Sequence, residues 1–157
     1  ASSNSGSARS SPVTTTNTTI ITPAADHSPN QATQQQEITT TMIKDNNSFV
    51  SETRENMKGG KGSVTLQHYF SKAEFGGQHI RVCAKLIIPP GASIGLHDHT
   101  GEDEVYIVLK GNGRVTDDGV VRDIHVGDAV LTGLGKSHGV ECIGEETLEI
   151  MALVVTY

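Results

Sequence analysis

The chain of 157 residues has no tryptophan, and aromatic residues make up only 4% of it. Its apolar runs are too short to cross a bilayer, so we expect no membrane partner. The 12 basic residues form no cluster and are outnumbered by 18 acidic ones. Because neutralising phosphates requires grouped Lys and Arg, we expect no nucleic-acid partner either. A chain of this length is expected to form one domain.

Cysteine is scarce as well, since the chain has only Cys83 and Cys142, and their spacing matches no metal-binding pattern. We expect buried free thiols, with a disulfide as the alternative. Reduced thiols slightly favour a cytoplasmic location, whereas the Ser/Thr-rich beginning and the missing initiator Met leave secretion open. From the start at Ala1 we expect a processed or recombinant chain, or a fragment.

Residues 1–41 hold few apolar side chains and consist largely of Ser, Thr, Gln and Asn. Such a composition cannot offset the loss of chain entropy, so it predicts a flexible arm. Within this arm, residues 13–22, VTTTNTTIIT, have strand propensity and could add to a sheet edge of the same or a neighbouring subunit. The alternative is a leader or tag in front of a domain that begins at Met42.

Glycine is plentiful, at 17 residues, and from about residue 63 short alternating segments are separated by turns. This pattern predicts an all-β domain over 42–157, with its core in 63–157, of the sandwich or barrel type. We expect no helix in this domain, and residues 44–57 give no clear pattern. The expected strands are 63–70, 78–88, 104–111, the two arms of a hairpin over 113–128 that turns at Asp117-Asp118-Gly119, then 129–132, 138–143 and 147–155.

Ionisable residues crowd into 97–104, HDHTGEDE, directly before an apolar run that should be buried. On a strand, His97 and His99 point to the same face, which is a natural start for a divalent-metal site. Glu104 begins the next strand and could supply an oxygen ligand. A cation would then offset the cost of burying charged groups. The alternative is a solvated acidic loop with two incidental histidines.

The spacing of residues 91–111 resembles the first motif of the cupin family, G(X)5HXH(X)3–4E(X)6G, at every defined position. The matching residues are Gly91, His97, His99, Glu104 and Gly111. Glu102 and Asp103 do not fit the spacing of the motif carboxylate.

Residues 127–142 look like the second cupin motif, G(X)5PXG(X)2H(X)3N, with Gly127, Gly135 and His138 in place. Gly133 stands where the family has Pro, and Cys142 stands where it has Asn. Cys142 either shapes the pocket or is a small apolar filler.

The resemblance implies an antiparallel jelly-roll barrel, also called a double-stranded β-helix, of six to eight strands. It also implies one divalent metal ion held by His97, His99, Glu104 and His138. Three imidazoles and a carboxylate suit Mn, Fe, Co, Ni or Zn and leave two positions open on an octahedral ion. These positions could take water, a bidentate organic acid, a diol or dioxygen.

Catalysis would need a positioned acid or base in addition to the metal. Tyr106 follows Glu104 by two residues and is the first candidate, with a plain core aromatic as the alternative. We expect the loops 100–103 and 133–137 to flank the opening. Further candidates are His68, His79, Arg81 and Lys85, whereas His125 and Lys136 are expected at the surface.

These features favour a small metalloenzyme that acts on a sugar or a small organic acid, by isomerase, epimerase or dioxygenase chemistry. We expect its pocket to measure several hundred cubic ångströms, as is usual for ligand sites. One alternative is a non-catalytic module that binds a small molecule. Another is an assembly protein whose Thr-rich arm docks on neighbouring barrels. The resemblance further implies a homodimer paired through an outer sheet face, and two-fold dimers are the commonest oligomers.

Overall fold

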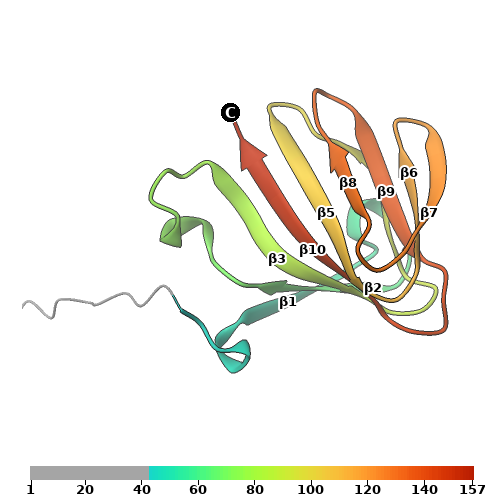
Figure 1. Cartoon of the computed structure of the whole chain (residues 1–157), viewed down its shortest axis with the longest axis horizontal. Coiled ribbons are helices and arrows are strands. Elements are labelled where there is room, and N and C mark those ends of the chain that lie inside the picture. Colours follow the sequence, from blue (N-terminus) through green and yellow to red (C-terminus); the bar gives the residue numbers. More distant parts are fainter. Residues whose placement is uncertain (1–42) are drawn as a thin grey trace, which may run out of the picture. The chain divides into compact units, whose positions relative to one another are not determined.

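The computed structural model describes residues 43–157, which form two antiparallel β-sheets (Figure 1). The larger sheet has the order β1-β2-β3-β10-β5-β8, and the smaller one has the order β4-β9-β6-β7. The larger sheet consists of β1 (Val50–Glu55), β2 (Ser63–His68), β3 (Ile80–Ile88), β10 (Leu148–Thr156), β5 (Glu102–Lys110) and β8 (Ala129–Thr132). The smaller sheet consists of β4 (Ser93–Asp98), β9 (Ser137–Cys142), β6 (Gly113–Asp117) and β7 (Val120–Ile124).

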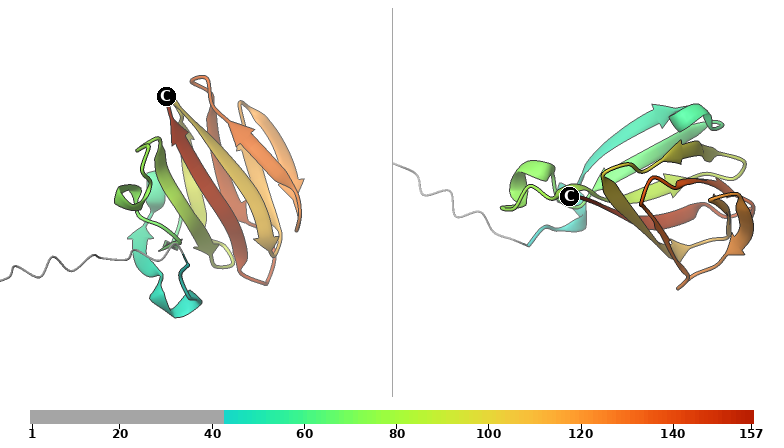
Figure 2. Two further views of the ribbon diagram at one scale, coloured as in Figure 1. Left: turned by 60° about the vertical axis from the view of Figure 1, so that its left-hand side comes forward. Right: turned by 90° about the horizontal axis from the view of Figure 1, so that it is seen from above.

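The connections between strands give the fold its jelly-roll character. From β3 to β10 the chain changes sheet at every connection except the β6–β7 hairpin. The two sheets are therefore wound together, as the two further views in Figure 2 show. This winding brings β4 and β9, which lie far apart in the sequence, side by side. The predicted all-β jelly-roll fold is confirmed.

The core lies between the sheets and follows from the period-two alternation of the strands. In β10, Leu148, Ile150, Ala152 and Val154 are buried, and the residues between them are partly exposed. The inward faces of β3 and β5 continue this apolar layer on either side of β10.

Two turns show why particular small residues are needed. Asp118 and Gly119, between β6 and β7, both have positive φ, of 47° and 81°, as the tight hairpin turn predicted for this place requires. Gly111 ends β5 with a φ of 74°, and a Cβ added there would lie 2.7 Å from the carbonyl oxygen of Thr147. A side chain at that position would therefore strain the end of β5.

The structure corrects several details of the sequence-based prediction. The described residues contain ten strands rather than six to eight, and β1 lies in the region 44–57 that gave no clear pattern. Every residue of β1 is exposed, so neither face needs apolar side chains and no alternation marks the strand. Glu102 and Asp103 belong to β5 instead of a loop, and Ser137 begins β9.

Helical structure between residues 43 and 157 is limited to three 3-10 turns, η1 (Asn46–Ser48), η2 (Met57–Gly59) and η3 (Lys72–Glu74). Within this part of the chain, no helix is both long and apolar enough to span a membrane. Cys83 and Cys142 are both free thiols. The predicted arm, residues 1–41, lies outside the described residues.

Candidate metal centre

Three histidines and a glutamate meet between the two sheets. His97 on β4 lies opposite His138 on β9, and His99 follows directly after β4. The smaller sheet thus supplies the imidazoles, and β5 of the larger sheet supplies Glu104. Backbone hydrogen bonds from the His99 amide to the Lys136 carbonyl (3.0 Å) and from the Gly135 amide to the His99 carbonyl (2.8 Å) hold His99 beside the start of β9.

The four side chains place one potential ligand atom each within 4.8 Å of all the others. Glu104 Oε2 lies 2.9 Å from His138 Nε2, 3.0 Å from His99 Nε2 and 3.9 Å from His97 Nε2. His99 Nε2 and His138 Nε2 are 3.1 Å apart. Neighbouring ligands on an octahedral ion with bonds of about 2.1 Å stand about 3 Å apart. The group can therefore hold a metal ion, and its donors suit a divalent transition metal.

The second nitrogen of each imidazole points away from this centre. His97 Nδ1 lies 3.0 Å from the Gly95 carbonyl, and His99 Nδ1 lies 2.9 Å from Glu102 Oε1. His138 Nδ1 is buried and has no hydrogen-bond partner within the described part of the chain. All three rings thus turn Nε2 toward the centre, so each can offer one nitrogen to a common ion.

Burial and hydrogen bonding set the charges at the centre. His99, His138 and Glu104 are almost fully buried. Burial raises the pKa of the Glu104 carboxyl, but hydrogen bonds to His138 and His99 outweigh it and lower the pKa to about 2. Burial lowers the pKa of His97, whereas the hydrogen bond to Glu104 raises that of His99. The centre therefore carries an ionised carboxylate, which favours a cation.

Tyr106 lies on the same face of β5 as Glu104, as predicted. Its ring stacks on the His138 ring with centroids 4.7 Å apart, and it is 2% exposed. Burial and the neighbouring Glu104 charge raise the pKa of the Tyr106 phenol well above its ordinary value. The hydroxyl therefore stays protonated and can act as a hydrogen-bond donor.

A cavity of about 60 Å³ adjoins the centre, far smaller than the several hundred cubic ångströms expected. Tyr106, three members of the centre and two cationic residues, Lys58 and Arg81, are among the residues that line it. The prediction of a large pocket at this site was wrong, because the apolar side chains of a tightly packed core fill most of the space between the sheets.

The other candidates from the sequence lie away from the centre. His68 pairs with Glu52, Lys85 pairs with Glu149, and His79 is exposed. His125 is exposed as expected. Cys142 packs in the apolar core and does not line the cavity beside the centre, so the structure favours the filler role.

Two residues at the site escaped the sequence analysis. Glu102 was set aside because it does not fit the motif spacing, yet it contacts His99 directly. Lys58 lies directly after the region 44–57, before the first predicted strand, and η2 brings it to the cavity. Glu102 stands two residues before Glu104, so strand periodicity was the signal that could have found it.

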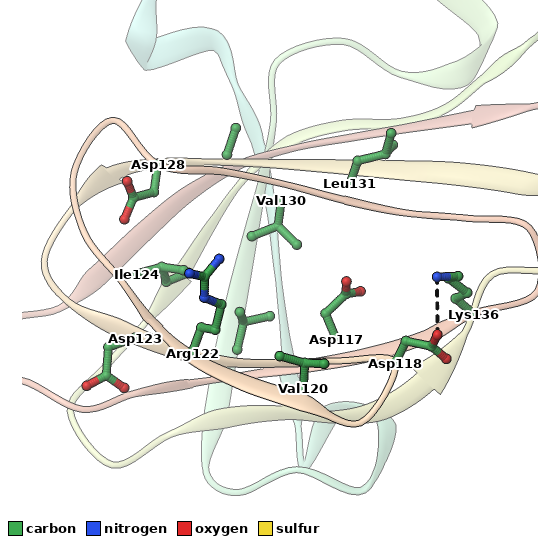
Figure 3. Close-up of a pocket in the computed structure, with 12 residues that line it drawn as sticks. Asp117, Asp118, Val120, Arg122, Asp123, Ile124, Asp128, Val130, Leu131 and Lys136 are labelled. Atoms are coloured by element: carbon green, nitrogen blue, oxygen red, sulfur yellow. Dashed lines mark ion pairs between the residues drawn. The ribbon is translucent and has the colours of Figure 1, made fainter.

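A larger cavity of about 630 Å³ lies elsewhere, between β7 and β8 (Figure 3). None of the four residues of the candidate metal centre lines it. Its charged residues include Arg122, three aspartates of the β6–β8 region, and an ion pair between Lys136 and Asp118. The volume expected for the site is thus present in the molecule, but away from the histidines.

Comparison with known proteins agrees with this fold. The family model described as "Cupin domain" matches residues 84–156. An oxalate-binding protein of Thermotoga maritima is 38% identical over 116 residues, which span 74% of this chain and 95% of that protein. The crystal structure of a predicted oxalate decarboxylase of the same organism has a TM-score of 0.70 and 37% identity, over 74% of this chain and all of that one.

A cupin barrel protein of Rhodopseudomonas palustris superposes with a TM-score of 0.57 at 14% identity, over 69% of this chain and 72% of that chain. A likeness at this identity shows the fold alone. Two wound sheets that enclose three imidazoles and a carboxylate define a small β-barrel with a candidate metal centre. The chain belongs to the cupin family.

Proposed function

We propose that this protein binds one divalent transition metal through His97, His99, Glu104 and His138, and that the metal holds a small organic anion of the oxalate class. The names of the two Thermotoga maritima proteins support this ligand class. The metal would supply a positive charge and two open positions, which two oxygens of one anion can fill together.

The size of the cavity beside the centre is the observation that carries the proposal. A cavity of about 60 Å³ has room for a small ligand only, since pockets for larger ligands usually measure about 300 to 1,000 Å³. A two-carbon dicarboxylate is such a small ligand, whereas a sugar or sugar phosphate needs several times that room. Between the two substrate classes that the sequence leaves open, the cavity therefore favours the small organic acid.

Charged side chains of both signs line the cavity, namely the carboxylates Asp98, Glu102 and Glu104 and the cations Arg81 and Lys58. Arg81 is already held by Glu102 through two hydrogen bonds, of 2.6 and 2.5 Å. Within residues 43–157, Lys58 has no carboxylate partner, so its ammonium group can attract an anionic ligand.

Metal-dependent turnover of the bound acid is the second candidate function, and Tyr106 is the residue that favours it. Tyr106 lines the cavity, and its phenol can donate a hydrogen bond or a proton to an oxygen of the bound ligand. Tyr106→Phe should leave metal content unchanged. If the protein is an enzyme, this variant should lose turnover by more than it loses affinity.

Metal analysis of protein purified without added metal tests the proposed function. Wild type should carry close to one transition-metal ion per chain, and calorimetry should show that oxalate binds only to the metal-loaded form. The double variant His97→Ala, His99→Ala and the single variant His138→Ala should lose the metal. His125→Ala, an exposed histidine away from the centre, is the control and should keep it. A full metal complement in His138→Ala would contradict the four-ligand arrangement.

A further inference from the structure

The orientation of His99 depends on a side chain outside the four proposed ligands. His97 is oriented by a backbone carbonyl, and His138 Nδ1 has no partner in the described part of the chain. His99 Nδ1, by contrast, lies 2.9 Å from the Glu102 carboxylate. Of the three rings, therefore, only His99 has an orienting contact that substitution of another side chain can remove.

The Glu102 carboxylate is itself fixed. Arg81 donates to it from Nε at 2.6 Å and from the terminal NH2 group at 2.5 Å, so both carboxylate oxygens are engaged. Such a two-pronged pair of a guanidinium and a carboxylate is geometrically specific. Arg81 and Glu102 come from β3 and β5, which lie on opposite sides of β10.

A break in the strand register explains how Arg81 reaches this position. Val82 of β3 pairs with Val154 of β10, and Ile80 pairs with Val155, so Arg81 has no residue opposite it. An extra residue of this kind is a β-bulge, and bulges redirect a side chain from the face that simple alternation would give it. Alternation alone would place Arg81 on one face of β3 and both Val82 and Ala84 on the other face. Arg81 nevertheless lines the cavity together with Val82.

We propose that Glu102, held by Arg81, is a positioning residue that keeps the His99 proton on Nδ1 and turns Nε2 toward the metal. This inference rests on the proposed metal binding at the same centre. An imidazole that donates one N–H to a carboxylate can offer only its other nitrogen to a metal, and its ring cannot rotate freely. Partners of this kind are usually worth about 10- to 100-fold in metal affinity.

The chain offers a matched control for this trio. Arg54, Glu52 and His68 form the same kind of chain, with an Arg54–Glu52 distance of 2.5 Å and a Glu52–His68 distance of 3.1 Å. None of these residues belongs to the centre or lines its cavity. Substitutions there change the same chemistry without touching a proposed ligand.

Zinc affinity, measured by competition with a chelator, tests the proposal in wild type, Glu102→Leu, Glu102→Gln and Glu52→Leu. Glu102→Leu should bind zinc about 10- to 100-fold more weakly. Glu102→Gln keeps an oxygen acceptor and should recover most of this loss, and Glu52→Leu should match wild type. If Glu102→Leu binds zinc as tightly as Glu52→Leu, the proposal is overturned. It is equally overturned if Glu102→Gln loses as much affinity as Glu102→Leu.

A second pair of variants covers the case in which Glu102→Leu fails to fold. Arg81→Gln frees the Glu102 carboxylate and should also weaken zinc binding. Arg54→Gln, its control, should leave zinc affinity unchanged. Equal zinc affinities for these two variants contradict the proposal. Nitrogen NMR of the zinc-loaded wild type should show the His99 proton on Nδ1, and a proton on Nε2 would refute the assigned role. If wild type itself binds no zinc, manganese, iron, cobalt or nickel, the proposed function fails as a whole.

Discussion

At the scale of single residues, the candidate metal centre depends on which nitrogen each imidazole presents. The amino-acid sequence supplies the three histidines and the glutamate at recognisable spacings, and these four residues do converge. The sequence does not supply the ring orientation, because the contacts of Nδ1 come from the Gly95 carbonyl and from Glu102. Such contacts depend on how the chain folds around the rings, and no motif spacing records them.

Lys58 gives a prediction at the same scale. Lys58→Gln should weaken oxalate binding to the metal-loaded protein about two- to five-fold, because it removes an exposed cation beside the cavity. Lys61→Gln removes an equivalent charge from a residue that does not line the cavity. It should leave oxalate affinity nearly unchanged, because salt screens the interaction between distant exposed charges. Calorimetric titration with oxalate measures both variants, and metal content should stay at the wild-type level in each. Equal oxalate affinities for the two variants would exclude Lys58 from ligand binding.

At the scale of elements, most strands could be predicted and their ends could not. Alternation of apolar residues located β3 and β10 within two residues of their ends, because one face of each strand is buried. β1 escaped because all of its residues are exposed. The start of β5 was placed two residues late because polar residues that pair and contact other side chains look like a loop in the sequence.

The bulge at Arg81 belongs to the same scale and shows a further limit of periodicity. Alternation predicts two faces for a regular strand, so it leaves open whether Arg81 or Val82 points inward. The register break lets both residues line the same cavity. Such a break depends on how β3 pairs with β10, which is a contact between segments about 70 residues apart.

The backbones of η2 and β4 lie close together at Gly95, and this gives an element-scale prediction. A Cβ added at Gly95 would lie 2.2 Å from the carbonyl oxygen of Lys58 and 2.8 Å from the amide nitrogen of Gly60. Backbone atoms cannot rotate out of the way, so Gly95→Ala should displace η2 or β4 and cost about 1–3 kcal/mol of unfolding free energy. Metal affinity should fall too, because the Gly95 carbonyl orients His97.

Gly76→Ala is the control for this prediction, since a Cβ added at Gly76 has no neighbour within 4 Å and its backbone is not in the left-handed region. Chemical denaturation of the metal-free proteins should place Gly76→Ala near wild type and Gly95→Ala well below it. Equal unfolding free energies would mean that η2 adjusts without cost and is not firmly seated on β4.

At the scale of the whole molecule, the jelly-roll winding is what makes a site out of scattered residues. His97 and His99 precede Glu104 closely in the sequence, but His138 comes from a strand formed much later in the chain. Only the crossing of the chain between the two sheets brings β9 beside β4. Fold and site are therefore a single prediction, because the spacing of the motifs has meaning only if the strands wind in this order.

The homodimer implied by the family resemblance remains a prediction at this scale, as does the docking of residues 1–41 on a neighbouring subunit. Deleting residues 1–41 should leave the metal content per chain unchanged, since all four proposed ligands and the core that buries them lie within residues 64–154. Light scattering of the full-length and shortened proteins measures their mass in solution at the same time. An assembly role for the arm requires that the number of chains per particle falls on deletion while metal binding persists, and an unchanged number argues for a leader or tag. Loss of the metal from the shortened protein would contradict the independence of the barrel, and His138→Ala in the shortened background provides the metal-free reference.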